Sequence, residues 1–110
     1  MSLLVFFCFK LNHIKTKACV SAGDHWNPSK TSHPDHAGDL GNVLMSRNGK
    51  IITEIKAEKL QLFGENSIIG RSVVLHEKID DLGKGGVPAS LLNGNAGKRI
   101  ACGSIAYEKP

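Results

Sequence analysis

The sequence has few aromatic residues, few cysteines and no long apolar run. Phenylalanine, tyrosine and tryptophan make up 5% of the 110 residues, and the 14 lysines and arginines are scattered along the chain. A nucleic-acid partner is therefore not expected, because such interfaces combine clustered positive charge with aromatic side chains that stack on bases. No segment approaches the roughly 18 consecutive apolar residues of a membrane-spanning helix, so no membrane partner is predicted.

The three cysteines, Cys8, Cys19 and Cys102, are too few for a disulfide scaffold and leave one unpaired if a bridge forms. They do not decide the redox compartment. Apolar residues make up 41% of the chain and charged residues 22%, which is typical of a small globular domain with a thin core. The net charge of +4 would also favour encounter with a small anionic substrate.

The first residues differ from the rest of the chain. Residues 3–9 form an unbroken apolar run, and Lys10, Lys15 and Lys17 follow it. A secretory signal would carry its positive charge before the apolar run, so a buried strand is the favoured interpretation.

Short β-type segments separated by turn residues make up the rest of the pattern, and no amphipathic helical stretch interrupts them. The Asn48-Gly49 pair is a strong hairpin signal. The pattern favours an antiparallel β-sandwich or barrel. The predicted strands are residues 42–45, 51–55, 70–76 and 99–107, and the predicted long loops are residues 21–41 and 80–97.

Three of the five histidines, His25, His33 and His36, lie with Asp39 inside fifteen residues of the first long loop. Imidazole nitrogens and a carboxylate oxygen suit zinc, which takes four ligands tetrahedrally. The spacing alone favours metal ligation and exposed, unliganded histidines about equally.

Four segments of the chain resemble the copper/zinc superoxide dismutase family, in the family's order and at similar spacing. The resemblance covers about ninety residues, from Cys19 to the C-terminus. The segments are residues 19–28 (Cys-Val-Ser-Ala-Gly-Asp-His-Trp-Asn-Pro), 36–42 (His-Ala-Gly-Asp-Leu-Gly-Asn), 70–86 (Gly-Arg-Ser-Val-Val-Leu-His-Glu-Lys-Ile-Asp-Asp-Leu-Gly-Lys-Gly-Gly) and 94–103 (Gly-Asn-Ala-Gly-Lys-Arg-Ile-Ala-Cys-Gly).

The resemblance implies an all-β fold, a Greek-key β-barrel of the dismutase type. Here the barrel is expected to be incomplete, with about four to five strands and two long functional loops. Residues 1–18 are an unmatched leader that offers at most one substitute strand, and residues 19–110 form the dismutase-like domain. Exposed strand edges in such a barrel invite dimerisation.

The resemblance also implies a role for each residue of a copper and zinc site, and both metals are expected as cofactors. An outer carboxylate that orients ligands is a recurrent support of metal sites. The implied roles are His25 as the ligand bridging copper and zinc, His33, His36 and Asp39 as the other zinc ligands, His76 as a copper ligand, Asp80 as the outer carboxylate, Arg99 as the guide for the anion, and Cys19 with Cys102 as the disulfide.

Two departures from the family bear on copper and on substrate. The family holds copper with four histidines, two of them in a His-x-His pair, and Cys8 and Lys10 stand at the corresponding positions. His13 is the single histidine of that region, and its spacing is wrong for a ligand. Leu92 stands where the family carries a guiding lysine.

The predicted function is the dismutation of superoxide to oxygen and hydrogen peroxide, impaired by the two missing copper ligands. The alternative is a non-catalytic zinc-binding isoform, or a dismutase-like domain of a copper chaperone, that acts through a partner subunit. The expected partners are superoxide, a second copy through Ile69, Gly70 and the C-terminal strand, and a copper chaperone. A cytoplasmic location is expected, with secretion as the alternative.

Overall fold

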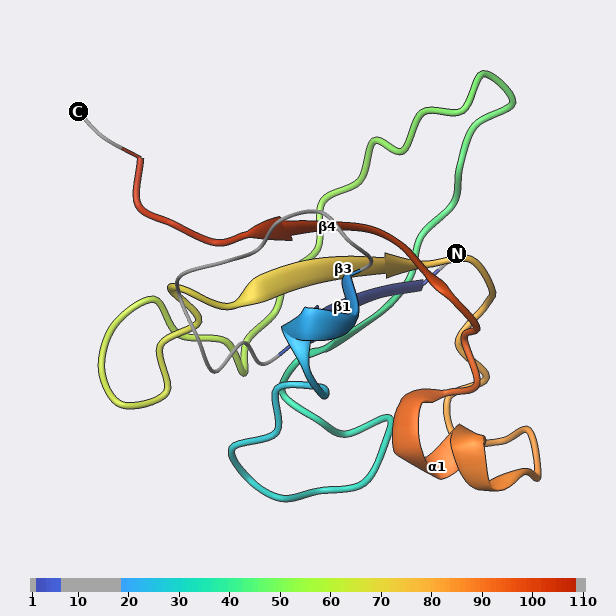
Figure 1. Ribbon diagram of the computed structural model, residues 1–110, viewed down its shortest axis with the longest axis horizontal. Coiled ribbons are helices and arrows are strands. Elements are labelled where there is room, and N and C mark those ends of the chain that lie inside the picture. Colours follow the sequence, from blue (N-terminus) through green and yellow to red (C-terminus); the bar gives the residue numbers. More distant parts are fainter. Residues whose placement is uncertain (1, 7–18, 109–110) are drawn as a thin grey trace.

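The structure is a computed structural model that describes residues 2–6 and 19–108. Within these residues, four antiparallel strands form the only sheet. The sheet order is β2-β1-β3-β4 (Figure 1). β1 thus lies between β2 and β3, both of which are far from β1 in the sequence. The elements are β1 (Ser2–Phe6), the 3-10 helix η1 (Cys19–Ala22), β2 (Asp39–Asn42), β3 (Ser72–His76), α1 (Pro88–Asn93) and β4 (Arg99–Ser104).

The core is thin, as expected for a chain of this length. Side chains of β3 alternate between buried and half-buried, and Val74 at its centre is fully buried. One buried cluster joins Val74 and Ala22 and packs against both cysteines of the disulfide. A second joins Trp26, Ala37 and Ile68 on the first long loop and before β3. The two clusters attach the loop to the sheet.

Two predicted strands are confirmed with shorter bounds. Residues 70–76 contain β3, and residues 99–107 contain β4. Main-chain pairing continues just past β4, because the Ile105 amide donates to the Arg71 carbonyl at 2.8 Å and the Gly70 amide donates to the Ile105 carbonyl at 2.8 Å. The apolar run at residues 3–9 overlaps β1, and residues 7–9 lie outside the described residues.

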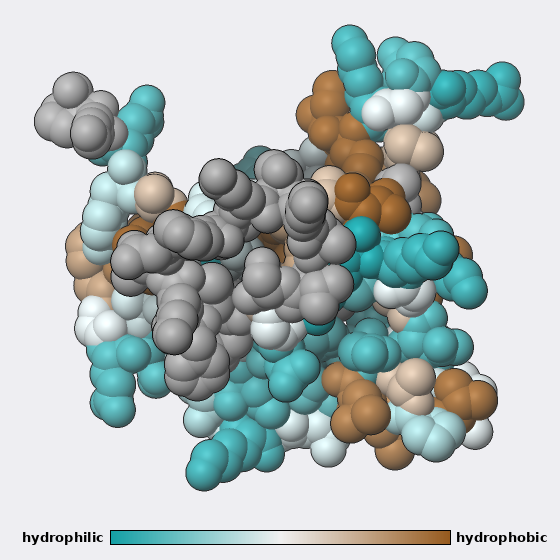
Figure 2. Space-filling view, viewed as in Figure 1, coloured by the Kyte–Doolittle hydropathy of each residue, from teal (hydrophilic) through white to brown (hydrophobic). Residues whose placement is uncertain are grey.

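The predicted hairpin of residues 42–55 is largely wrong. Its first strand lies earlier, as β2, and residues 51–55 form no strand. The turn itself forms, since the Ser46 amide donates to the Lys50 carbonyl at 2.8 Å. However, Leu44 and Ile52 are 92% and 91% exposed, and the segment between the buried Val43 and the cavity residues 55–59 projects from the sheet (Figures 1 and 2). The alternating apolar residues find no facing layer among the described residues, so the pattern does not become a strand.

The second long loop contains α1, which the sequence analysis did not predict. Pro88 begins the helix, where its fixed φ fits and its missing amide hydrogen costs nothing. Gly94 ends it at a φ of 73°. Six residues are too few to show helical periodicity, so only these two signals were available.

The all-β class is confirmed by the sheet, whereas the described residues form an open sheet instead of a closed barrel. Among residues 2–6 and 19–108, no helix has the length and apolar character needed to cross a bilayer.

Candidate metal centre

Four potential metal ligands come together on the segment between η1 and the start of β2: His25, His33, His36 and Asp39. Each contributes one donor atom to a group in which all donor atoms lie within 4.8 Å of one another. The three histidines are buried, with exposures of 7%, 2% and 9%. A buried set of three nitrogens and one oxygen matches the ligand number and type that zinc prefers.

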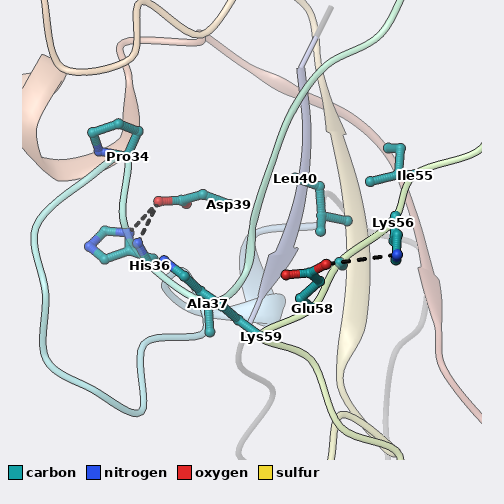
Figure 3. Close-up of a pocket in the computed structure, with 10 residues that line it drawn as sticks. Pro34, His36, Ala37, Asp39, Leu40, Ile55, Lys56, Glu58 and Lys59 are labelled. Carbon is teal, nitrogen blue, oxygen red and sulfur yellow. Dashed lines mark hydrogen bonds and ion pairs between the residues drawn. The ribbon is translucent and has the colours of Figure 1, made fainter.

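Asp39 is the centre of this cluster. One carboxylate oxygen lies 2.7 Å from His25 Nδ1, and the other lies 3.1 Å from His33 Nδ1 and 3.2 Å from His36 Nδ1. Figure 3 shows the His36 ring directed toward this carboxylate. Burial raises the pKa of Asp39, but the hydrogen bond with His25 and the charges of the three histidines outweigh burial, so the pKa lies below its ordinary value. Asp39 is thus held as a carboxylate.

Local turns bring the four ligand residues together. The Asp39 amide donates to the His36 carbonyl at 3.0 Å, and the Gly38 amide donates to the Trp26 carbonyl at 2.9 Å. Trp26 is 4% exposed, and the Arg71 guanidinium lies 3.3 Å from the centroid of its ring. The loop is therefore anchored on a buried aromatic residue next to His25.

Asp80 supports the cluster from the second long loop. Its Oδ1 lies 2.6 Å from His33 Nε2 and accepts a hydrogen bond from the Leu82 amide at 2.8 Å. His33 therefore lies between two carboxylates, with Asp39 at one ring nitrogen and Asp80 at the other. In the tautomer in which Nε2 donates its proton to Asp80, the lone pair of Nδ1 faces the cluster and is available to a metal.

Asn42 holds the backbone of Asp80, a contact that the sequence analysis missed. Its side-chain oxygen accepts from the Asp80 amide at 2.8 Å, and its side-chain nitrogen donates to the Asp80 carbonyl at 3.1 Å. The one available signal was the position of Asn42 at the end of a segment that resembles the family.

A second region surrounds His76 at the end of β3 and shares His25 and His36 with the first. His25, His76 and Arg99 line a cavity of about 540 Å³, together with Leu92 and Asn93 of α1. The His76 Nδ1 donates to the Gly97 carbonyl at 2.9 Å. Burial lowers the pKa of His76, which keeps the ring neutral and able to bind a metal.

Arg99 lines this cavity at the start of β4 and is hydrogen-bonded to the segment that begins with the disulfide. The Arg99 guanidinium donates to the Cys19 carbonyl at 2.8 Å and to the Gly23 carbonyl at 2.6 Å. Cys19 and Cys102 are bonded, with their Cα atoms 5.7 Å apart, as the resemblance implied. Together these contacts fix the start of the histidine loop against the last strand.

The described residues bring together the whole implied zinc set and only part of the implied copper set. His25, His36 and His76 line the same cavity, but His25 and His36 also belong to the zinc set, so His76 is the one histidine that this cavity adds among the described residues. Cys8, Lys10 and His13, which the sequence analysis weighed at the missing copper positions, lie outside the described residues.

The sequence analysis also missed a cavity of about 300 Å³ beside the cluster. It lies between His36 and Asp39 on one side and residues 55–59 on the other, with the ion pair of Lys56 and Glu58 at 3.8 Å on its rim (Figure 3). No motif marks residues 55–59, so proximity in the fold was needed to find it.

Comparison with known proteins gives the family. Residues 7–105 match the family model described as copper/zinc superoxide dismutase. Superoxide dismutase (Cu-Zn) 5 of Dictyostelium discoideum is 48% identical over 100 residues, which cover 86% of this chain and 66% of that protein. Extracellular superoxide dismutase (Cu-Zn) of Caenorhabditis elegans is 50% identical over 93 residues, which cover 79% of this chain and 42% of that protein. The chain thus spans less than two thirds of either relative, and it belongs to the copper/zinc superoxide dismutase family.

Proposed function

We propose that this chain binds zinc through His25, His33, His36 and Asp39, and that it dismutates superoxide far more slowly than a complete family member. The observation that carries the proposal is the contrast between its two metal regions. The zinc region has four donors within 4.8 Å of one another, whereas the cavity at His76 adds only that one histidine to His25 and His36 of the zinc set among the described residues.

Zinc fits the residues present. The lowered pKa of Asp39 leaves a carboxylate beside three buried imidazole rings, a set of one oxygen and three nitrogens that can bind a dication. The closed ligand set makes zinc structural, because no position is left for water or substrate. Zinc would tie the long loop to β2, and its binding energy would add to folding stability.

Copper does not fit the described residues as a complete site. Copper, when bound, would supply the one-electron exchange with superoxide for which the family is named. His25 and His76 would be its ligands here, and two imidazoles are few for an ion that must stay bound in both oxidation states. The described residues alone therefore do not complete a redox copper site.

The remaining residues of the cavity act on the anion. Arg99 carries a positive charge on the cavity wall, which attracts a small anion such as superoxide. Leu92, at the position of the family's guiding lysine, is 68% exposed and adds no charge at the mouth. Encounter with the anion should therefore be slower and less sensitive to salt than in a member with that lysine.

The second candidate is a non-catalytic, zinc-binding protein that acts through a partner subunit, as an isoform or as a domain like that of a copper chaperone. The two-histidine copper region favours it as well. Under either function we expect a second copy to pack through Ile69, Gly70 and β4, copper delivery by a chaperone, and a cytoplasmic location.

The test is metal analysis followed by a superoxide assay on zinc- and copper-loaded protein. We expect about one equivalent of zinc, lost in the variant carrying His33→Ala and His36→Ala, and activity orders of magnitude below a complete family member. Absence of zinc would refute the zinc site. Full activity that His76→Ala abolishes would refute the proposed impairment, because Cys8, His13 or a partner would then complete the copper site.

A further inference from the structure

Asn42 occupies a position that links the two carboxylates on either side of His33. It is the last residue of β2, three residues after Asp39, and its amide group makes two reciprocal hydrogen bonds with the backbone of Asp80. The Asp80 side chain in turn lies 2.6 Å from His33 Nε2. One short strand therefore carries Asp39 and the residue that fixes Asp80.

This arrangement sets the orientation of the His33 ring. Asp80 Oδ1 lies 2.6 Å from Nε2 and holds the ring there, whereas Nδ1 lies 3.1 Å from Asp39 Oδ2 without a hydrogen bond and faces the other donors of the cluster. The His33 side chain is fully buried, and so is that of Asp80. If Asp80 shifted along its loop, the ring would have to turn or lose the bond that keeps its proton on Nε2.

We propose that Asn42 is a positioning residue for zinc, acting on His33 through the backbone of Asp80. The inference rests on the proposed zinc binding and adds a residue to that site. Among the described contacts, the side chain of Asn42 is linked to the cluster through its two hydrogen bonds with the Asp80 backbone.

The effect on zinc should exceed the effect on folding. Asn42 is itself exposed, so water can replace its amide at the Asp80 backbone when the side chain is shortened. Water satisfies the same hydrogen bonds but does not fix a distance between β2 and the loop. The substitution should therefore loosen the His33 ring without unfolding the chain.

The experiment compares zinc affinity in the wild type, Asn42→Ala and Asn66→Ala, with a chromophoric chelator as competitor. Asn66 is also exposed, lines a different cavity beside Asp35 and Ala37, and provides the same chemical change at a residue that does not hold the Asp80 backbone. Loss of an outer-shell partner weakens metal binding 10–100-fold, so about a 10-fold loss is expected for Asn42→Ala and none for Asn66→Ala. A change of less than about two-fold for Asn42→Ala would overturn the inference.

A double-mutant cycle separates positioning from general destabilisation. In an Asp80→Ala background the imidazole has already lost its support, so Asn42→Ala should weaken zinc binding no further. A second, additive loss would show that Asn42 does not act through Asp80, and would overturn the inference.

A measurement on the metal-free protein separates this inference from the proposed function. The His33 Nε2 proton, bonded to a buried carboxylate, should give a slowly exchanging imidazole NMR signal in the wild type and in Asn66→Ala. We expect exchange with water to accelerate about 10-fold or more in Asn42→Ala, as a loosened bond requires. If the wild type bound no zinc, the proposed function would fail, and this signal would still decide the role of Asn42: unchanged exchange in Asn42→Ala would overturn it.

Discussion

Removing the disulfide between Cys19 and Cys102 should cost a large part of the stability of this chain. The bond closes a loop with a sequence separation of 83 residues. In the chain-entropy model, closing a loop of that length stabilises the folded state by about 4.5 kcal/mol. A small domain has a total stability of about 5–15 kcal/mol, so the loss would be between a third and nearly all of it.

The perturbation also reaches the metal region. Both cysteines pack against Ala22 and Val74, and the Cys19 carbonyl accepts the bond from Arg99. We therefore expect the variant with Cys19→Ala and Cys102→Ala to bind anions more weakly in the cavity as well as to unfold more readily.

Urea unfolding followed by circular dichroism measures this loss, with Cys8→Ala as the matched control. The control should keep the wild-type midpoint, and the denatured, unreduced wild type should show one free thiol. Equal midpoints for the double variant and the wild type, or a count of three thiols, would refute the reasoning.

Three further predictions follow from the described contacts. Burial holds the pKa of His76 below its ordinary value of 6.5, so the unfolded state binds more protons than the folded state below about pH 6.5. The metal-free protein therefore loses stability as the pH falls from there toward the pKa of the folded state. Between about pH 7.5 and 5.5 the urea midpoint should fall less in His76→Gln than in the wild type, and equal falls would contradict this. Gly94→Ala would place a methyl group against Asp80 and His33 at a left-handed φ of 73°, so zinc affinity should fall at least as far as in Asp80→Ala, and wild-type affinity would contradict the contact. Val74→Ala removes two carbons from a fully buried site and should lower the free energy of unfolding by about 2 kcal/mol, measured by urea unfolding, whereas a loss below about 0.5 kcal/mol would show that the site is not packed.

Sequence patterns predicted an element correctly where a single short segment contained all the residues that determine it. β3 was predictable because Val73, Val74 and Leu75 form a short β-type run, whereas its alternating burial, with Ser72 and His76 buried at its ends, could not be read from hydrophobicity alone. Residues 51–55 show β-type residues equally well, yet they form no strand, because a strand also needs a facing layer. The segment itself cannot reveal whether the rest of the chain supplies that layer.

The metal centre divides in the same way. His25, His33, His36 and Asp39 were singled out by their types and spacing within one loop, which favoured ligation and exposure about equally, and the family resemblance gave their roles. The contact between Asn42 and Asp80 spans 38 residues, and asparagine is so common in turns that its type alone indicates nothing. α1 was missed because tertiary contacts, such as the bond from the His33 amide to the Leu91 carbonyl at 3.2 Å, stabilise a helix too short to show a period.

Trp26 gives the molecule its own optical reporter. It is the single tryptophan of the sequence, it is buried beside His25, and the Arg71 cation lies over its indole ring. Its emission therefore comes from one site, next to the proposed zinc ligands. Because a cation over the ring and burial both change indole fluorescence, and because Val73 of β3 packs against the Trp26 cluster, the intensity and wavelength should follow the docking of the histidine loop on the sheet.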